Sequence, residues 1–362
     1  IYGRFSNFVN VGFSGNPGLV ASSLMGNPAL KPERQREIEG GADIGVFGDR
    51  ALLEVTYYHK RTFDLVLAAP LPLSTGFSSQ LQNVGVLRNK GWELALTTVN
   101  LNTSKLGWRS TLSLAANRSL VEKLVTASDT LVFGYLNAVI PGQPLGVFYG
   151  GVYVRDAAGH IVYQDTTIGG VLYRQMPLRA RDTVQTAAGP TFPFAQRIIG
   201  DPNPKLLASL MNTFDLGRRV QFSILFDGRF GNDVANFTRR ITEFFGASKV
   251  IEREISRDTF PRTFTLNPTG RINIYEEYIE PGGFVKLREV AVRFRFDQPW
   301  VRKLGAETLD LRLAGRNLVT WTNYSGLDPE INLFTENTVA RGVDFANTPL
   351  PRSFTASVTL HF

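Results

Sequence analysis

Two carboxylates near the C-terminal end of the sequence suit metal binding or acid–base chemistry. Asp328 and Glu330 are two residues apart in the segment YSGLDPE. Carboxylate oxygens are the ligands that hard divalent cations prefer, and a carboxylate can also transfer a proton. However, no histidine or further carboxylate accompanies them at ligand spacing, while Gly326 and Pro329 are typical of a turn that Asp328 can cap. The segment therefore predicts a turn rather than a metal or catalytic site.

A second acidic stretch, FDGRFGND at residues 226–233, is weakly similar to a calcium-binding loop. Asp227 and Asp233 flank two glycines, but the ligand series of an EF-hand and its closing Glu are missing, which favours a strand that leads into a loop. His59, His160 and His361 are widely separated and have no partner motif. No catalytic triad, metal site or phosphate loop emerges, so the sequence predicts no enzyme, no metal and no cofactor.

The last residues of the chain show which kind of element would position such side chains. The segment RSFTASVTLHF at 352–362 alternates strictly, with Phe354, Val358 and Phe362 on one face and Ser353, Ser357 and His361 on the other. This period of two is that of a β-strand. One apolar and one polar face fit a soluble sandwich as well as a transmembrane barrel, so the strand alone leaves both open.

Composition narrows the class of protein. The chain has 362 residues, 43% of them hydrophobic, and no run of eighteen apolar residues, which excludes a helical membrane protein and a disordered chain. Its 26 Phe, 11 Tyr, 34 Gly and 19 Pro favour an all-β protein with many turns. Cysteine is absent, which excludes disulfides and thiolate metal sites. The net charge of +7 is spread without a basic cluster, so nucleic acid is not expected as a partner.

Nine segments read as strands, and the connections between them alternate in length. The predicted strands are 36–46, 50–68, 86–100, 107–117, 205–215, 219–230, 284–297, 307–320 and 352–362. Short connections fall at 47–49, 101–107, 216–219 and 301–307, and long ones at 69–85, 118–204, 231–283 and 321–351. Many of these strands are long enough to cross a membrane at a tilt, for which roughly nine to eleven residues are needed. An antiparallel meander of this kind is typical of an outer-membrane barrel.

Two neighbouring predicted strands carry full charges on one face. Along REVAVRFRFD and LDLRLAGRN, large apolar residues alternate with charged ones. If the polar face lines a lumen, the lumen-facing charges are Glu289, Arg293, Arg295, Asp310, Arg312 and Arg316. A soluble sheet that buries its apolar face is the alternative. The positions of Trp92, Trp108, Trp300 and Trp321 near predicted strand ends fit interfacial girdles, although aromatic residues favour strands in general.

Four stretches together carry a family resemblance: NPALKPERQREIEGGADIGVF at 27–47, LLEVTYYHKRTFDLVLAAPLPLSTGF with NVGVLRNKGWELAL over 52–96, IIGDPNPK at 198–205, and FVKLREVAVRF with GRNLVTWTNYSGLDPEI over 284–331. In order and spacing they resemble the C-terminal part of SusC/RagA-family TonB-dependent outer-membrane transporters. The resemblance implies a barrel of about twenty-two strands with an N-terminal plug. It also implies active import of a glycan, oligosaccharide or peptide, coupled to the TonB complex and served by a SusD-like surface lipoprotein.

The resemblance implies a domain organisation and a location. Residues 36–362 would supply about nine C-terminal strands of a barrel in the lipid of the bacterial outer membrane, and residues 1–35 the preceding extracellular loop. The plug and the first strands are absent from this sequence, so we expect it to be part of a longer polypeptide. The loops at 118–204, 231–283 and 321–351 would be extracellular, and the C-terminus would lie at the periplasmic rim.

The long loops are the expected place for substrate or lipoprotein contacts. In 231–283 we expect Phe244, Phe245, Tyr275 and Tyr278 to stack on sugar faces or to hold the lipoprotein, unless they pack the loops against one another. Within 118–204, VRDAAGHIVYQD predicts a small hairpin that turns at Ala158 and Gly159.

Two other functions remain open. A barrel of this ancestry could serve as a structural or assembly scaffold in the outer membrane without transport, and a soluble carbohydrate-binding sandwich is the third possibility. An upstream plug and TonB-box would favour transport, and solubility without detergent would favour the sandwich.

Overall fold

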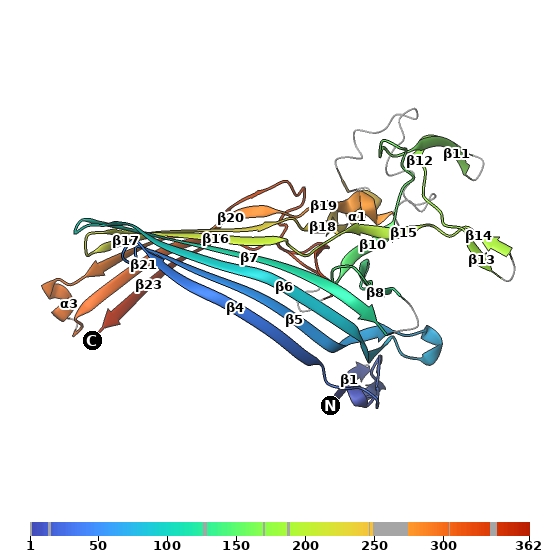
Figure 1. Ribbon diagram of the computed structural model, residues 1–362, viewed down its shortest axis with the longest axis horizontal. Helices are drawn as coiled ribbons and strands as arrows, with labels where there is room; N and C mark the ends of the chain where they lie inside the picture. The colour runs from blue at the N-terminus through green and yellow to red at the C-terminus, as the bar shows by residue number, and fades with distance from the viewer. Residues whose placement is uncertain are drawn as a thin grey trace.

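One curved antiparallel sheet dominates the computed structural model, which describes residues 2–13, 16–125, 129–168, 171–186, 189–245, 247–248, 274–303, 305–333 and 339–362. Its strands follow one another in sequence order across the sheet (Figure 1). They are β4 (Arg34–Val46), β5 (Ala51–Pro70), β6 (Ser79–Asn102), β7 (Leu106–Leu124), β16 (Leu206–Leu216), β17 (Val220–Phe230), β20 (Phe284–Phe296), β21 (Thr308–Thr322) and β23 (Ser353–His361). The nine predicted strands are therefore confirmed. The short β3 (Leu24–Met25) adds a parallel pairing to β6.

The register keeps the alternating residues of neighbouring strands on common faces. Phe296 lies opposite Leu309, which lies opposite Leu360, while Arg295 and Asp310 form the adjacent rung. Because successive side chains of a strand point to opposite sides, this register gives the sheet one apolar and one polar face. The sheet arches into a trough with β4 and β23 at its two edges (Figure 1).

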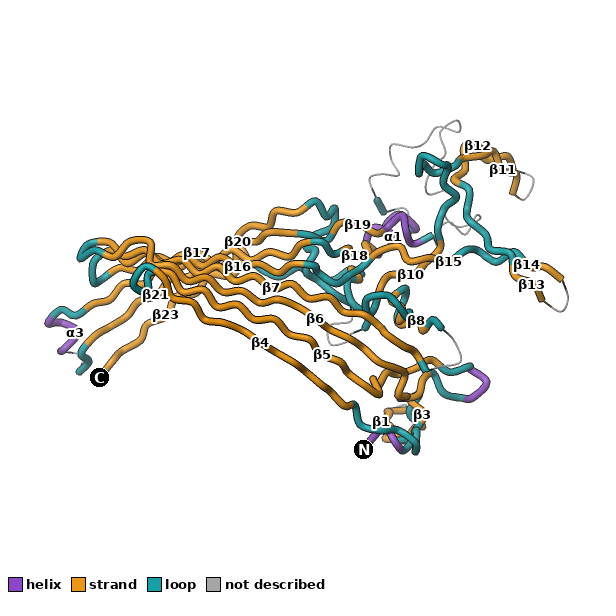
Figure 2. The backbone as a smooth tube through the Cα atoms, in the orientation of Figure 1, coloured by secondary structure: helices purple, strands orange, loops and turns teal. Residues whose placement is uncertain are grey.

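The connections sort to the two ends of the trough, as their lengths predict (Figure 2). Short turns join β4 to β5, β6 to β7 and β16 to β17, and the short helix α3 (Pro299–Lys303) lies between β20 and β21. The turn at Gly217 has a φ of +61°, a conformation that glycine adopts without steric cost. We call this the short-turn end, where the C-terminus also lies, and the opposite end the long-loop end (Figure 1).

Two strands are longer than predicted. β6 begins at Ser79 instead of residue 86, and β7 continues to Leu124 instead of residue 117. The expected connection 69–85 is accordingly much shorter, because β5 ends at Pro70. The pairing of β6 with β7 shifts register between Val86 and Leu87 and then continues to Gly85 and Leu124, towards the long-loop end.

Smaller elements build the loops. They are the strands β1 (Phe8–Phe13), β2 (Asn16–Ala21), β8 (Leu131–Phe133), β9 (Asn137–Val139), β10 (Val147–Gly151), β11 (Tyr163–Ile168), β12 (Val171–Pro177), β13 (Val184–Thr186), β14 (Gly189–Thr191), β15 (Gln196–Gly200), β18 (Asp233–Asn236), β19 (Ile279–Pro281) and β22 (Val343–Asp344), the helix α1 (Phe237–Phe244), and 3-10 turns at Tyr2–Arg4, Leu73–Thr75 and Tyr275–Tyr278. The predicted hairpin turn is present, with the Asp156 amide donating to the carbonyl of His160 at 2.9 Å and Gly159 at a φ of +87°. The pairs β11–β12 and β13–β14 project away from the trough (Figure 1).

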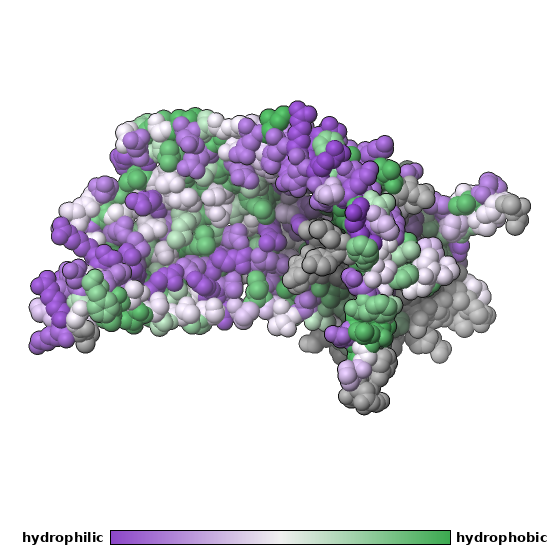
Figure 3. Space-filling view, turned by 90° about the horizontal axis from the view of Figure 1, so that it is seen from below, coloured by the Kyte–Doolittle hydropathy of each residue, from purple (hydrophilic) through white to green (hydrophobic). Residues whose placement is uncertain are grey.

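Two apolar cores lie at the long-loop end. The first joins Leu65, Leu87 and Val121 of the sheet to Val139 and Val339 of the loops. The second lies within the loops and contains Leu136, Phe148, Ala235, Phe237 and Val343. The loops are thus packed onto β5, β6 and β7 near the long-loop end of these strands. The space-filling view from below shows a hollow where the strands meet the loops (Figure 3).

Candidate functional site

The polar face of β20, β21 and β23 brings together the charges that the sequence singles out. Arg293 lies opposite Arg312, Arg295 opposite Asp310, and Glu289 opposite Arg316. Ser357 and Thr359 of β23 continue the same rungs. The six charged residues therefore share one face of the sheet, as their alternation predicts.

These charges are cross-linked in two groups. The Glu289 carboxylate accepts from Arg312 Nη2 at 2.5 Å and from Arg316 Nε at 2.7 Å. Asp310 accepts from Arg295 Nε at 3.0 Å, with Arg293 at 4.0 Å and His361 Nε2 at 3.4 Å. Four arginines thus share two carboxylates, so this wall of the trough has a surplus of positive charge.

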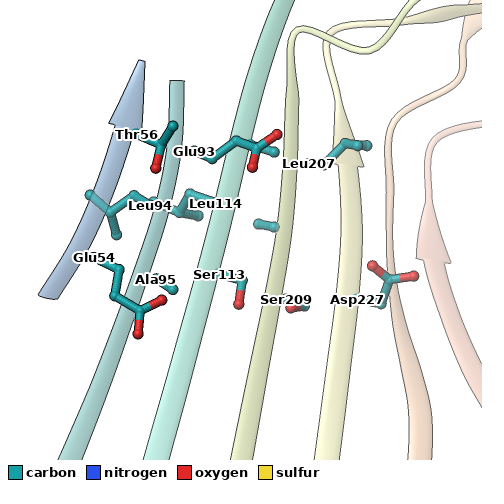
Figure 4. Close-up of a pocket in the computed structure, with 12 residues that line it drawn as sticks. Glu54, Thr56, Glu93, Leu94, Ala95, Ser113, Leu114, Leu207, Ser209 and Asp227 are labelled. Carbon is teal, nitrogen blue, oxygen red and sulfur yellow. The ribbon is translucent and has the colours of Figure 1, made fainter. Parts of the chain in front are cut away.

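The opposite wall has an excess of carboxylates, with Lys60 and Arg341 as the cations among its lining residues. Glu37 and Glu39 of β4, Glu54 of β5 and Glu93 of β6 line two adjoining hollows of the polar face, about 370 and about 610 Å³ in volume. Figure 4 shows Glu54 and Glu93 with Asp227 across neighbouring strands, and small residues such as Ser113 and Ser209 between them. The trough can therefore interact with solutes that carry both charges, and its small central residues leave room for them.

A buried ion cluster joins the connection between β21 and β23 to the polar face. Lys286 of β20 is 1% exposed, and its Nζ donates to Asp328 Oδ1 at 2.8 Å, to Asp328 Oδ2 at 3.0 Å and to Glu330 Oε2 at 2.8 Å. The pair Asp328 and Glu330 is therefore neutralised by a lysine and holds a turn, in line with the predicted turn. We call Lys286, Arg288, Asp227, Asp328 and Glu330 the latch.

Arg288 extends the latch to β17. Its guanidinium donates to Glu330 Oε2 at 3.0 Å and also to Asp227. Burial would raise the pKa of Glu330, but the hydrogen bonds from Arg288 and Lys286 outweigh burial and hold that pKa below its usual value. Sequence reasoning missed the latch because Lys286 and Asp328 lie far apart in the chain and carry no motif.

A second polar cluster links the connection between β21 and β23 to α1. Asp344 is 2% exposed and accepts from Thr238 Oγ1 at 2.7 Å and from the Tyr324 hydroxyl at 2.5 Å. Burial and the neighbouring Asp344 carboxylate raise the pKa of Tyr324. Asn236 begins α1 by accepting from the Arg239 amide at 2.8 Å. The loops at the mouth of the trough are thus held by buried polar contacts.

The four aromatic residues predicted as contacts differ in exposure. Phe245 is 73% exposed, and its ring lies 5.0 Å from that of Phe244. Tyr275 is half-buried and packs on Phe237 at 5.1 Å. Tyr278 is fully buried, with its hydroxyl 3.3 Å from Glu243 Oε2. Tyr278 therefore packs the loop, which is the alternative that the sequence left open for these rings. A contact role stays a prediction for Phe244, Phe245 and Tyr275.

The remaining chemical candidates are placed apart. Asp227 belongs to the latch, whereas Asp233 accepts from the Asp201 amide at 2.8 Å, so the two do not form a cation loop. Within the described parts of the chain, no group of three or more His, Cys, Asp or Glu side chains is arranged to hold a metal ion. In the same ranges, no helix combines the length and the apolar character needed to cross a membrane.

Comparisons with known proteins agree with this architecture. The family model "TonB dependent receptor-like, beta-barrel" matches residues 1–318. The chain is 29% identical to TonB-dependent receptor P26 of Formosa agariphila over 361 residues, which are 93% of this chain and 35% of that protein. It is 28% identical to TonB-dependent receptor SusC of Bacteroides thetaiotaomicron over 105 residues, 29% of this chain and 10% of that one. The chain spans about a third of the length of the first curated relatives it matches.

Solved structures show the same fold. The RagAB peptide transporter superposes with a TM-score of 0.72 at 21% identity, covering 99% of this chain and 38% of that one. The RagAB peptide importer in its "closed-closed" state gives 0.71 at 20% identity, covering 98% and 38%. The similarity to SusC agrees with the predicted resemblance to the SusC/RagA family. The match of the family model over most of the chain shows that this protein belongs to the family of TonB-dependent receptor-like β-barrels.

Proposed function

We propose that this chain forms part of the wall of a barrel that imports a charged oligomer across the bacterial outer membrane with energy from TonB. The observation that carries the proposal is the trough, whose polar face has carboxylates on β4 to β6 and an arginine surplus on β20 and β21. In the barrel this polar face lines the lumen, and the apolar face meets lipid. Nine strands covering about a third of the relatives' length would combine with the rest of a longer polypeptide, including its plug.

A peptide is the substrate class that fits best. Walls of opposite sign complement a chain that carries both amino and carboxylate groups, whereas a neutral glycan would use neither wall. RagAB, whose fold this chain shares, is a peptide transporter, which is consistent with this choice. Oligosaccharides remain the alternative substrate. We place the long loops outside the cell beneath a SusD-like lipoprotein, with Phe245 among the contacts, and the C-terminus at the periplasmic rim.

Uptake in cells tests this proposal. Cells that express the full-length receptor are given fluorescent mixed-charge peptides or labelled neutral oligosaccharides, with TonB present or deleted. We expect peptide uptake that disappears without TonB. Uptake of neither substrate in TonB-containing cells, together with an intact barrel, would instead support a scaffold without transport.

A further inference from the structure

A groove opens on the apolar face where β7 runs past the start of β16. β16 pairs with β7 only from the rung of Leu207 and Ala115 towards the short-turn end. Beyond this rung, towards the long-loop end, a groove of about 760 Å³ lies between β7 and the segment 201–205. The groove is lined by two aromatic rings, two prolines and three cationic side chains: Tyr57, Trp92, Pro144, Pro204, Lys90, Arg118 and Lys205.

The aromatic part of the groove is continuous with the apolar face. Tyr57 lies opposite Trp92, which lies opposite Ala116. The two ring centroids are 4.8 Å apart, and 57% of Trp92 is exposed. In a barrel, rings at this position mark the level where hydrocarbon meets headgroups. The lower part of the groove therefore presents a surface suited to an acyl chain.

The cationic part begins two residues further towards the long-loop end, on the next rung whose side chains point to the same face. Lys90 and Arg118 lie directly opposite each other on that rung, and both are exposed. The rung is about 7 Å closer to the long-loop end than the rung of Tyr57 and Trp92. Like charges that face each other across strands destabilise a sheet unless an anion compensates them. By contrast, Arg61 and Arg88 on the following rung share the carboxylate of Glu122.

Lys205 completes the cluster from the other side of the groove. Among the described residues, none of Lys90, Arg118 and Lys205 has a carboxylate at ion-pair distance. The acidic residue that lines the groove, Asp201, accepts from the Asn203 amide at 3.0 Å and from its Nδ2 at 2.8 Å and keeps its charge, and Asp233 interacts electrostatically with Lys205. The groove therefore holds an excess of positive charge directly above an apolar surface.

We infer that this groove binds the phosphate-bearing headgroup of an anionic outer-membrane lipid, with an acyl chain over Trp92 and Tyr57. The cations lie at headgroup level, where basic residues attract anionic lipid. The inference rests on the proposed function for the orientation of the apolar face towards lipid, but it requires no transport.

Lipid binding to the full-length receptor tests the inference. The receptor is purified in detergent and titrated with lipid A, and retained lipid is counted by native mass spectrometry. Each basic residue near an anionic surface contributes roughly a factor of five, so the triple variant Lys90→Gln, Arg118→Gln, Lys205→Gln should bind about 100-fold more weakly. The matched control changes Lys105, Arg218 and Arg302 at the short-turn end to Gln, removing the same charge, and should bind like the unchanged receptor.

Two further arms separate the lipid from other anions. The variant Trp92→Ser should bind lipid A more weakly while leaving all charges in place, and dephosphorylated lipid A should bind poorly to every variant. Equal binding by the triple variant and its control, equal binding of dephosphorylated lipid, or binding of inorganic phosphate alone would overturn the inference. Peptide uptake is measured separately, so a failure of lipid binding is distinguishable from a failure of import.

Discussion

Removing the lysine of the latch should release the connection between β21 and β23. In Lys286→Met, the side chain keeps its length but loses its charge, which leaves the carboxylates of Asp328 and Glu330 without their shared donor. The side chains of Lys286 and Asp328 are only 2% and 7% exposed, so water cannot replace the lost contacts without opening the loop. Breaking a buried ion pair in this way typically costs about 3–5 kcal/mol.

The expected magnitude sets the assay. Hydrogen exchange of the full-length receptor in detergent reports local opening through the amides of Tyr324 and Glu330, which donate to Thr322 Oγ1 and Asp328 Oδ1. At roughly 1.4 kcal/mol per factor of ten, exchange should become faster by about a hundredfold to a few thousandfold.

A matched control isolates the buried charge. Lys105→Met removes the same group at an exposed turn, where we expect a change within about 0.5 kcal/mol and unchanged exchange in the loop. Adding Asp328→Asn to Lys286→Met should restore part of the protection, because it removes the charge of Asp328, whereas Glu330 stays paired with Arg288. Equal exchange in Lys286→Met and Lys105→Met would refute the latch.

Three further predictions concern pH, membrane orientation and loop packing. Because the pKa of Glu330 is lowered in the folded state, the latch should keep its full strength above the usual glutamate range, and loop protection should fall as pH drops through the lowered value, as followed by hydrogen exchange. Val358→Arg on the apolar face of β23 should cost about 2–4 kcal/mol of barrel stability if this position lies near the bilayer midplane, whereas Ser357→Arg on the polar face should cost far less. Heat-modifiable gel mobility measures the stability of both variants. Equal effects of the two substitutions would contradict the assignment of faces. Gly146→Ala should destabilise the loops by about 1–3 kcal/mol, because Gly146 has a φ of +74° and a Cβ there would lie 2.3 Å from the carbonyl oxygen of Val339. Gly142 also has a positive φ, but a Cβ there would meet open space. Comparing Gly142→Ala with Gly146→Ala in thermal unfolding therefore separates the steric clash from the backbone strain.

The strands were predictable from the sequence because a period of two persists along each of them. The prediction stopped short on β6 and β7 where the environment of the two faces changes. Near the long-loop end, Leu87 and Val121 are buried against the loops, while the exposed Arg61 pairs with the half-buried Glu122. An apolar residue there no longer marks a lipid-facing position, so the simple pattern ends before the strand does.

Within the candidate site, local alternation and long-range contacts had different outcomes. The shared face of Arg295 and Asp310 follows from alternation and register, and so was predictable. The partnership of Lys286 with Asp328 depends on how a long connection folds back, and the burial of Tyr278 depends on its packing beside Glu243. Neither carries a local signal.

The most direct measurement concerns whether the polar face lines an aqueous passage while the apolar face meets lipid. This chain contains no cysteine, so single cysteines at Ser357 and Val358 of β23 are the reactive thiols once any cysteine elsewhere in the full-length receptor is replaced by serine. The full-length receptor in lipid vesicles is treated with a water-soluble maleimide and, separately, with a membrane-restricted one. We predict that Ser357→Cys reacts with the water-soluble reagent and Val358→Cys with the membrane-restricted one; the reverse pattern, or equal labelling of both by the water-soluble reagent, would contradict the account.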